Sequence, residues 1–309
     1  MNEFELIERY FRRPPQHPDV RVGIGDDGAV VAPLPGIEYV MTVDMLVEGR
    51  HFVTGTDPAR LGHKTLAVNL SDLAAMGALP RFALLAVALP DADPAWVAAF
   101  MRGFDALARR HDVELIGGDT TRGPRNLCVT AIGALPAGSA LLRSGARAGD
   151  AIYVSGTLGD AALALAVADG RADVEPRSRA ALALRLDAPE PRVALGVALR
   201  GIASAAIDVS DGLIGDLGHI LTESQVGATV DIASVPCSPA LRAAGNARAH
   251  RCIGTRARAA PDDDRIDRRR GGAADSRRAG AAAIPAARGV RSLPMSSAGP
   301  GCNPRRSHS

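Results

Sequence analysis

The chain has 309 residues, 47% of them apolar, which is enough to build packed cores in two domains of ordinary size. It contains no run of eighteen apolar residues, and its first thirteen residues do not form a secretion signal, so we expect a soluble protein of the cytoplasm. Residues 1–241 carry 21 basic and 29 acidic side chains (net −8), whereas residues 242–309 carry 15 and 5 (net +10). The acidic body argues against nucleic-acid binding, which needs a basic surface. The four cysteines are too widely spaced to predict a zinc site or a disulfide framework.

The first half of the chain alternates helices and strands. Residues 3–13 predict an amphipathic helix that Pro14 ends. A second helix is expected from Pro58 to about Met76, with Asp57 as its N-cap, and a third from 94 to about 111. Strands are expected at 20–22, 29–32, 39–43, 82–89, 113–116 and 127–135, with a loop at Gly117-Gly118-Asp119.

The second half begins where Pro, Gly, Ala and Ser become frequent, at about 136–150. Its expected elements are strands at 151–155, 204–209 and 228–233 and helices at 158–169, 178–200 and 211–223. Alternating strands and helices in both halves predict an α/β or α+β fold. The predicted organisation is a domain at 1–138, a second at 139–241 and a tail at 242–309.

Acidic loops are the strongest local signal. A single Gly-Asp or Ser-Asp pair is usually an ordinary turn. Several such loops favour a Mg²⁺-bound polyphosphate, because Mg²⁺ binds a few carboxylates together with water and substrate phosphates, and glycine lets the backbone approach phosphate oxygens. The loops are Gly23-Ile24-Gly25-Asp26-Asp27, Thr42-Val43-Asp44, Asn69-Leu70-Ser71-Asp72, Gly117-Gly118-Asp119 and Asp208-Val209-Ser210-Asp211-Gly212.

The helix at 58–76 places Thr65, Asn69 and Asp72 on one stripe, because they are spaced i, i+4 and i+7. Leucines at 66, 70 and 73 form a second stripe, so we expect the carboxylate to face away from the core. An ordinary solvated helix face remains the alternative for this helix taken alone.

Two common phosphate-binding motifs do not fit. The only lysine, Lys64, lacks the glycine loop of a P-loop. Gly23, Gly25 and Gly28 match the dinucleotide fingerprint in spacing, but Pro33 and Pro35 prevent the long helix that must follow it.

Longer strings carry a family resemblance. Ala67 to Ala78, Ile116 to Pro124 and Asp208 to Leu213, together with His51-Phe52 and Arg143-Ser144-Gly145, resemble the bacterial thiamine-monophosphate kinase family. The resemblance covers about 1–241. It implies a two-domain α/β (α+β) fold similar to aminoimidazole ribonucleotide synthetase, with an N-terminal sheet-forming domain, an incomplete C-terminal α/β domain and a homodimer formed through the N-terminal sheets.

The implied activity is direct in-line transfer of the ATP γ-phosphoryl group to thiamine monophosphate, giving thiamine diphosphate. Both partners are anions, so charge neutralisation and positioning matter more than a catalytic base, and no catalytic residue is assigned. By resemblance, ATP contacts Gly118, Arg143 and Ser210, and the thiamine phosphate contacts His51. Lys64 is a weaker candidate for phosphate neutralisation. The implied Mg²⁺ ligands are Asp27, Thr42, Asp44, Asp72, Asp119, Asp208 and Asp211.

The tail departs from this resemblance. Residues 242–309 contain no Phe, Tyr, Trp, Glu or Lys and only six Val, Ile, Leu or Met, so they cannot bury enough apolar surface and should be disordered. Their Arg, Ala and Gly content fits GC-rich DNA translated out of frame, which suggests a frameshift near 242–252. A nucleic-acid-binding tail, an inactive remnant with a partial Mg-ATP cleft, and another ATP-using member of the superfamily remain alternatives.

Overall fold

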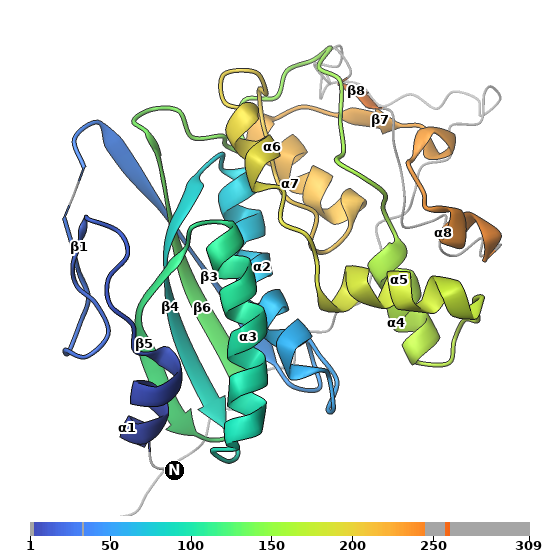
Figure 1. Ribbon diagram of the computed structural model, residues 1–309. Coiled ribbons are helices and arrows are strands. Elements are labelled where there is room, and N and C mark those ends of the chain that lie inside the picture. Colours follow the sequence, from blue (N-terminus) through green and yellow to red (C-terminus); the bar gives the residue numbers. More distant parts are fainter. Residues whose placement is uncertain (1–2, 33, 245–256, 260–309) are drawn as a thin grey trace, which may run out of the picture. The chain divides into compact units, whose positions relative to one another are not determined.

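The computed structural model describes residues 3–32, 34–244 and 257–259, all within one compact unit, Met1–Asp263. Helices and strands are mixed in the first half of this unit, whereas in the second half four helices follow one another before its first strand (Figure 1). The first half contains α1 (Glu3–Leu6), η1 (Ile7–Phe11), β1 (Val20–Val22), β2 (Val30–Val31), β3 (Ile37–Val47), α2 (Pro58–Ala75), β4 (Leu79–Leu89), α3 (Pro94–Arg110), β5 (Glu114–Arg122) and β6 (Asn126–Pro136). The second contains α4 (Asp160–Ala168), α5 (Pro176–Asp187), α6 (Val193–Ala198), α7 (Leu213–Ser224), β7 (Ala228–Val230), η2 (Ile232–Ser234), α8 (Pro239–Ala243) and β8 (Ala257–Ala259).

A four-stranded sheet organises the first half, with the spatial order β3-β6-β4-β5. β6 is antiparallel to both of its neighbours, β3 and β4. β4 and β5 are parallel, and α3 is the crossover between them, as a parallel pair requires. β3 therefore forms one edge of the sheet.

Two helices, α2 and α3, lie side by side on one face of this sheet (Figure 1). The predicted cap of α2 is confirmed, because the Asp57 side chain accepts the Arg60 N–H at 2.8 Å. Two glycines allow the helices to approach closely. An added Cβ would lie 2.0 Å from the Phe100 carbonyl oxygen at Gly62 and 1.7 Å from the Ala59 carbonyl oxygen at Gly103. The core leucines of α2 pack in this layer, where Leu66, Leu70 and Leu73 are fully buried.

The polar stripe of α2 is not a solvated face at two of its three positions. Thr65 and Asn69 are fully buried. Thr65 Oγ1 donates to the Leu61 carbonyl at 2.7 Å, and Asn69 Nδ2 donates to the Thr65 carbonyl at 3.1 Å. These bonds to the preceding turn satisfy the Thr65 hydroxyl and the Asn69 amide N–H, whereas the buried Asn69 Oδ1 accepts no hydrogen bond. Asp72 alone of the three is left half-exposed.

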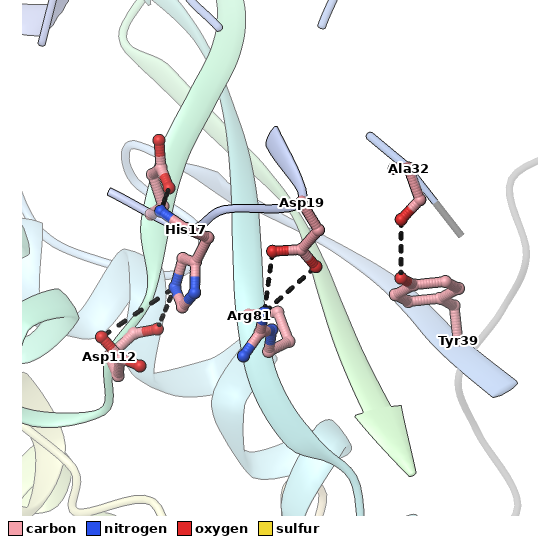
Figure 2. Close-up of polar contacts among 7 residues, drawn as sticks. His17, Asp19, Ala32, Tyr39, Arg81 and Asp112 are labelled. Atoms are coloured by element: carbon pink, nitrogen blue, oxygen red, sulfur yellow. Dashed lines mark hydrogen bonds and ion pairs between the residues drawn. The ribbon is translucent and has the colours of Figure 1, made fainter. Parts of the chain in front are cut away.

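The N-terminal segment covers part of the other face of the sheet. Val20 of β1 packs against Phe82 and Ile116 in a separate apolar cluster. Figure 2 shows the polar contacts of this segment: both carboxylate oxygens of Asp19 accept from Arg81 Nη2, at 2.9 and 3.0 Å. His17 Nε2 lies 2.9 Å from the Asp112 carbonyl oxygen (Figure 2). Because Asp19 and His17 are buried, these bonds also satisfy groups that would otherwise be costly to desolvate.

The second half has its own apolar cluster, in which Leu163 of α4 and Leu182 of α5 pack with Val235 and Leu241. It also packs on the first half: an added Cβ at Gly196 of α6 would lie 1.9 Å from the Ala74 carbonyl oxygen of α2. The two halves therefore meet along α2, from the ion pair of Arg60 with Asp187 near its start to Gly196 at its C-terminal end.

Several predicted elements of the second half are wrong. Residues 151–155 and 204–209 form no strand. The helix expected at 178–200 is two helices, α5 and α6, because Pro189 and Pro191 interrupt it. In the first half, β5 continues to Arg122, so the loop expected at Gly117-Gly118-Asp119 is part of a strand.

The predicted tail begins inside α8 and lies mostly outside the described residues, so its disorder and the domain boundaries stay predictions. Within it, β8 pairs antiparallel with β7. No helix in the described part of the chain is long and apolar enough to cross a membrane.

Candidate acidic phosphate site

Strand β3 supplies the first part of the site because its side chains alternate between the two faces of the sheet. Val40 and Leu46 pack in the helix-side core, and Thr42 and Asp44 share their parity. Thr42 Oγ1 donates to Asp72 Oδ2 of α2 at 2.5 Å. The predicted residues Thr42, Asp44 and Asp72 therefore lie between β3 and α2.

The second part of the site comes from the other half of the chain. Ser71 Oγ on α2 donates to Asp208 Oδ2 at 2.8 Å. Ser71 was not predicted as a site residue, although it precedes Asp72 in the same string. Its hydroxyl joins the Asn69 to Asp72 segment to the Asp208 to Gly212 loop.

The carboxylates influence one another electrostatically. Burial raises the pKa of Asp44, the negative charge of Asp208 raises it further, and His51 opposes both effects. Burial likewise raises the pKa of Asp72, and so do Asp208 and Asp44, against the Thr42 hydrogen bond and the charge of Arg143. Because negative charge is unfavourable here, the group is suited to a cation.

A buried carboxylate shapes the loop at 208–212. Asp216 lies in the first turn of α7, and its Oδ2 accepts the Ser210 N–H at 3.0 Å and the Gly212 N–H at 3.1 Å. Burial raises the pKa of Asp216, the two backbone bonds lower it, and the charges of Asp208 and Asp211 raise it. The sequence does not identify Asp216 as a site residue either, since an acidic residue in the first turn is common in any helix.

His51 belongs to a tight turn after β3. The His51 N–H donates to the Val47 carbonyl at 2.9 Å, and the Val47 N–H donates to His51 Nδ1 at 3.0 Å. Lys64 Nζ on α2 donates to the His51 carbonyl at 3.0 Å. The turn thus presents an exposed imidazole next to Asp44.

The remaining predicted residues are less tightly gathered. The positive charge of Arg143 lowers the pKa of Asp72. The Arg143 carbonyl accepts a hydrogen bond from Ser224 Oγ at 2.9 Å. The described contacts do not join Asp27 or Asp119 to the group; Asp27 N–H donates to Asp26, and Asp119 pairs with Ala86 along β5. Across the described ranges, no three His, Cys, Asp or Glu side chains stand close enough to hold a metal ion by themselves.

Gly118 has a structural explanation that the sequence did not suggest. Its φ is +151°, and an added Cβ would lie 1.9 Å from the Leu85 carbonyl oxygen of β4. The register between β4 and β5 shifts beside it, at Ala83 and Leu84. Glycine is therefore needed by the sheet itself, whatever its role toward a ligand.

A groove of about 600 Å³ lies elsewhere, between η1 and α3, and the predicted site residues do not line it. Its walls include Arg9, Arg13, Arg102 and Arg109.

The two halves match two related family models. The model for AIR synthase related protein, N-terminal domain, matches residues 25–135, and the model for AIR synthase related protein, C-terminal domain, matches residues 147–250. The fold and the acidic loops thus define a two-domain protein of the AIR synthase related class.

Individual relatives narrow this class. The chain is 51% identical to thiamine-monophosphate kinase of Salmonella typhimurium over 241 residues, which are 77% of this chain and 74% of the relative. It is 48% identical to the crystal structure of thiamine-monophosphate kinase from Stenotrophomonas maltophilia, with a TM-score of 0.76, over 85% of this chain and 87% of that one. AaThiL complexed with AMPPCP and TMP is 30% identical, with a TM-score of 0.67, over 77% and 80%. The chain belongs to the thiamine-monophosphate kinase family, so the predicted family and two-domain α/β (α+β) fold are confirmed.

Proposed function

We propose that this chain transfers the γ-phosphoryl group of ATP to the phosphate of thiamine monophosphate, giving thiamine diphosphate and ADP. The observation that carries the proposal is the convergence of Thr42, Asp72, Ser71 and Asp208 through two hydrogen bonds. Family membership and the AaThiL complex with AMPPCP and TMP support the identity of the two substrates. ATP as a substrate also favours the cytoplasm as the location.

Mg²⁺ is part of the proposal. The donor set fits, because Asp44, Asp72 and Asp208 offer the hard oxygen ligands that Mg²⁺ prefers, and burial raises the pKa of Asp44 and Asp72, so their negative charge favours a bound cation. Asp27, Thr42, Asp119 and Asp211 complete the proposed ligand set. These residues leave coordination positions to phosphate oxygens and water, as is usual for Mg²⁺ in phosphotransferases. Bound Mg²⁺ would neutralise phosphate charge and align the two substrates.

The other site residues position the substrates. Arg143 offers a planar pair of N–H donors suited to a phosphate of ATP. Gly118 and Ser210 are proposed to contact ATP, and the bonds from Ser210 and Gly212 to Asp216 fix the loop that carries Ser210. His51 is proposed to contact the phosphate of the acceptor. A phosphate monoester is already ionised at neutral pH, so no side chain has to remove a proton from the attacking oxygen.

The deciding experiment incubates the purified full-length chain with ATP, thiamine monophosphate and Mg²⁺, and measures thiamine diphosphate by chromatography. Formation that depends on Mg²⁺ supports the proposal. Binding of ATP without turnover would instead favour an inactive remnant. Turnover of ATP only with a different acceptor would favour another reaction of the superfamily.

The state of the tail belongs to the same question. The hypothesis of a frameshift near 242–252 predicts that another reading frame of the coding DNA continues the family's sequence, including a Gly-Gly-Glu-Asp-like segment. If neither alternative frame does so, the hypothesis is wrong. Salt-dependent nucleic-acid binding that disappears when 242–309 is deleted would support the competing explanation.

A homodimer is the last part of the proposal. Met41, Val43 and Met45 of the edge strand β3 are all more than half exposed, and they share the face opposite α2. An apolar row on an edge strand is unfavourable in water and favours association. A second copy of the chain is the proposed occupant.

A further inference from the structure

The turn that carries His51 is fixed at several points. Gly49 N–H donates to the Phe52 carbonyl at 2.7 Å, and Glu48 forms an ion pair with Arg125 at 3.0 Å. Phe52 is buried in the helix-side core. Contacts of the fold therefore hold the turn on both sides of His51, and they fix where the backbone of His51 lies.

The hydrogen bond to the imidazole determines which ring nitrogen carries the proton. A backbone N–H can only donate, so the bond from Val47 requires Nδ1 of His51 to be the acceptor. The proton of the neutral ring is then on Nε2. Because the side chain is exposed, this N–H is available to an anion in front of the site.

Lys64 secures the backbone of the same residue. The Nζ of Lys64 donates to the His51 carbonyl at 3.0 Å. Lys64 lies within α2, so the backbone that carries it is held in a regular helix. Burial lowers the pKa of Lys64, whereas the charge of Asp187 raises it. It is the single lysine of the chain, beside 35 arginines among the 36 basic residues.

From this geometry we infer that Lys64 is a positioning residue: its ammonium group holds the His51 carbonyl, and thereby aims the Nε2–H of His51 at the phosphate of the acceptor substrate. This inference rests on the proposed function for the identity of that phosphate. The compact ammonium group suits a single carbonyl acceptor, whereas an arginine would bring a wider, planar group to the same place.

The kinetic test compares Lys64→Met with Lys64→Arg in the full-length chain. Lys64→Met should raise the KM for the phosphorylated acceptor about tenfold, because a hydrogen bond from a charged donor is lost, and leave the KM for ATP nearly unchanged. Lys64→Arg keeps the positive charge but brings a wider group, so its KM for the acceptor should lie between those of the wild type and Lys64→Met. Arg60→Met is the matched control, since Arg60 lies one turn earlier on α2 and interacts with Asp187 of the second half. Equal changes in both KM values, or a loss of kcat alone together with a lower melting temperature, would overturn the inference.

A second readout does not depend on turnover. Nitrogen-15 NMR of the histidine rings should show His51 with its proton on Nε2, the signal being assigned by its loss in His51→Gln. Lys64→Met should shift this signal toward a mixture of tautomers, and Arg60→Met should not. An unchanged His51 signal in Lys64→Met contradicts the inference. If the wild type shows no kinase activity but Lys64→Met still shifts the nitrogen-15 signal of His51, the proposed function fails while the positioning of His51 by Lys64 stands.

Discussion

Ser71 Oγ donates a hydrogen bond of 2.8 Å to Asp208 Oδ2, joining two residues that are 137 positions apart in the sequence. Ser71 lies in the last turns of α2, and Asp208 lies in a loop without helix or strand. The bond is part-buried, so water competes with it only weakly. It is one of the contacts that bring the acidic residues of the second half to those of the first.

Replacing Ser71 by alanine should therefore weaken nucleotide binding. The charged carboxylate of Asp208 would lose the hydrogen bond that the Ser71 hydroxyl donates, for which about 1.5 kcal/mol, or about tenfold in the dissociation constant, is expected. Calorimetric titration of the chain with ATP and Mg²⁺ measures the effect. Ser139→Ala is the control, because the exposed Ser139 hydroxyl only donates to the Pro136 carbonyl. Equal affinities of the two variants would show that the Ser71 bond does not organise the site.

Asp72→Asn should separate stability from activity. Burial, together with Asp208 and Asp44, raises the pKa of Asp72, so the folded protein holds this proton more tightly than the unfolded chain does. The stabilising contribution of Asp72 is then present below its ordinary pKa and is lost as the pH rises through the folded-state value. At neutral pH the neutral asparagine should leave the melting temperature unchanged or higher without Mg²⁺, because its amide oxygen can still accept from Thr42.

The same variant should lose kinase turnover by at least about a hundredfold, since a proposed Mg²⁺ ligand has lost its charge. Melting curves without divalent ions and turnover assays with Mg²⁺ are both needed. The control is Asp93→Asn, at the exposed N-cap of α3. Full turnover in Asp72→Asn would refute the metal assignment, and a large loss of stability would refute the electrostatic argument.

The helices that carry the site could be predicted from the sequence, because caps and prolines mark their ends locally. Asp57 and Pro58 start α2 as expected. The course of the chain around the acidic residues was less predictable. Gly117 to Asp119 reads as a turn by composition but continues a strand, because β4 supplies backbone partners that no local pattern contains.

The pairing of side chains within the site was also beyond sequence reasoning. The contact of Ser71 with Asp208 depends on how two distant segments meet in three dimensions. The residue types are informative, since the sequence pattern alone indicates Asp44, Asp72 and Asp208, and the pKa of Asp44 and of Asp72 depends on the charge of Asp208. Spacing along the chain identifies the candidates, and tertiary packing decides which of them interact.

Gly118→Ala should disrupt the sheet. The new Cβ would lie 1.9 Å from the Leu85 carbonyl oxygen, and the φ of +151° is strained for any other residue. We expect a loss of about 3 kcal/mol or more in the free energy of unfolding, measured by urea denaturation. Gly123→Ala is the matched control, because its Cβ would meet only the Ala88 side chain, at 3.6 Å. A stable Gly118→Ala protein that fails only to bind ATP would mean that this glycine serves the ligand rather than the sheet.

Val43→Glu should break the proposed homodimer. Val43 is 61% exposed on the edge strand β3, between Met41 and Met45, so a second copy would have to desolvate the new carboxylate. The chain should sediment as a monomer at concentrations where the wild type is a dimer. Ile202→Glu is the control, since Ile202 is 77% exposed and belongs to the second half of the chain. A dimer that persists in Val43→Glu but not in Ile202→Glu would move the interface from the strand to the second half of the chain.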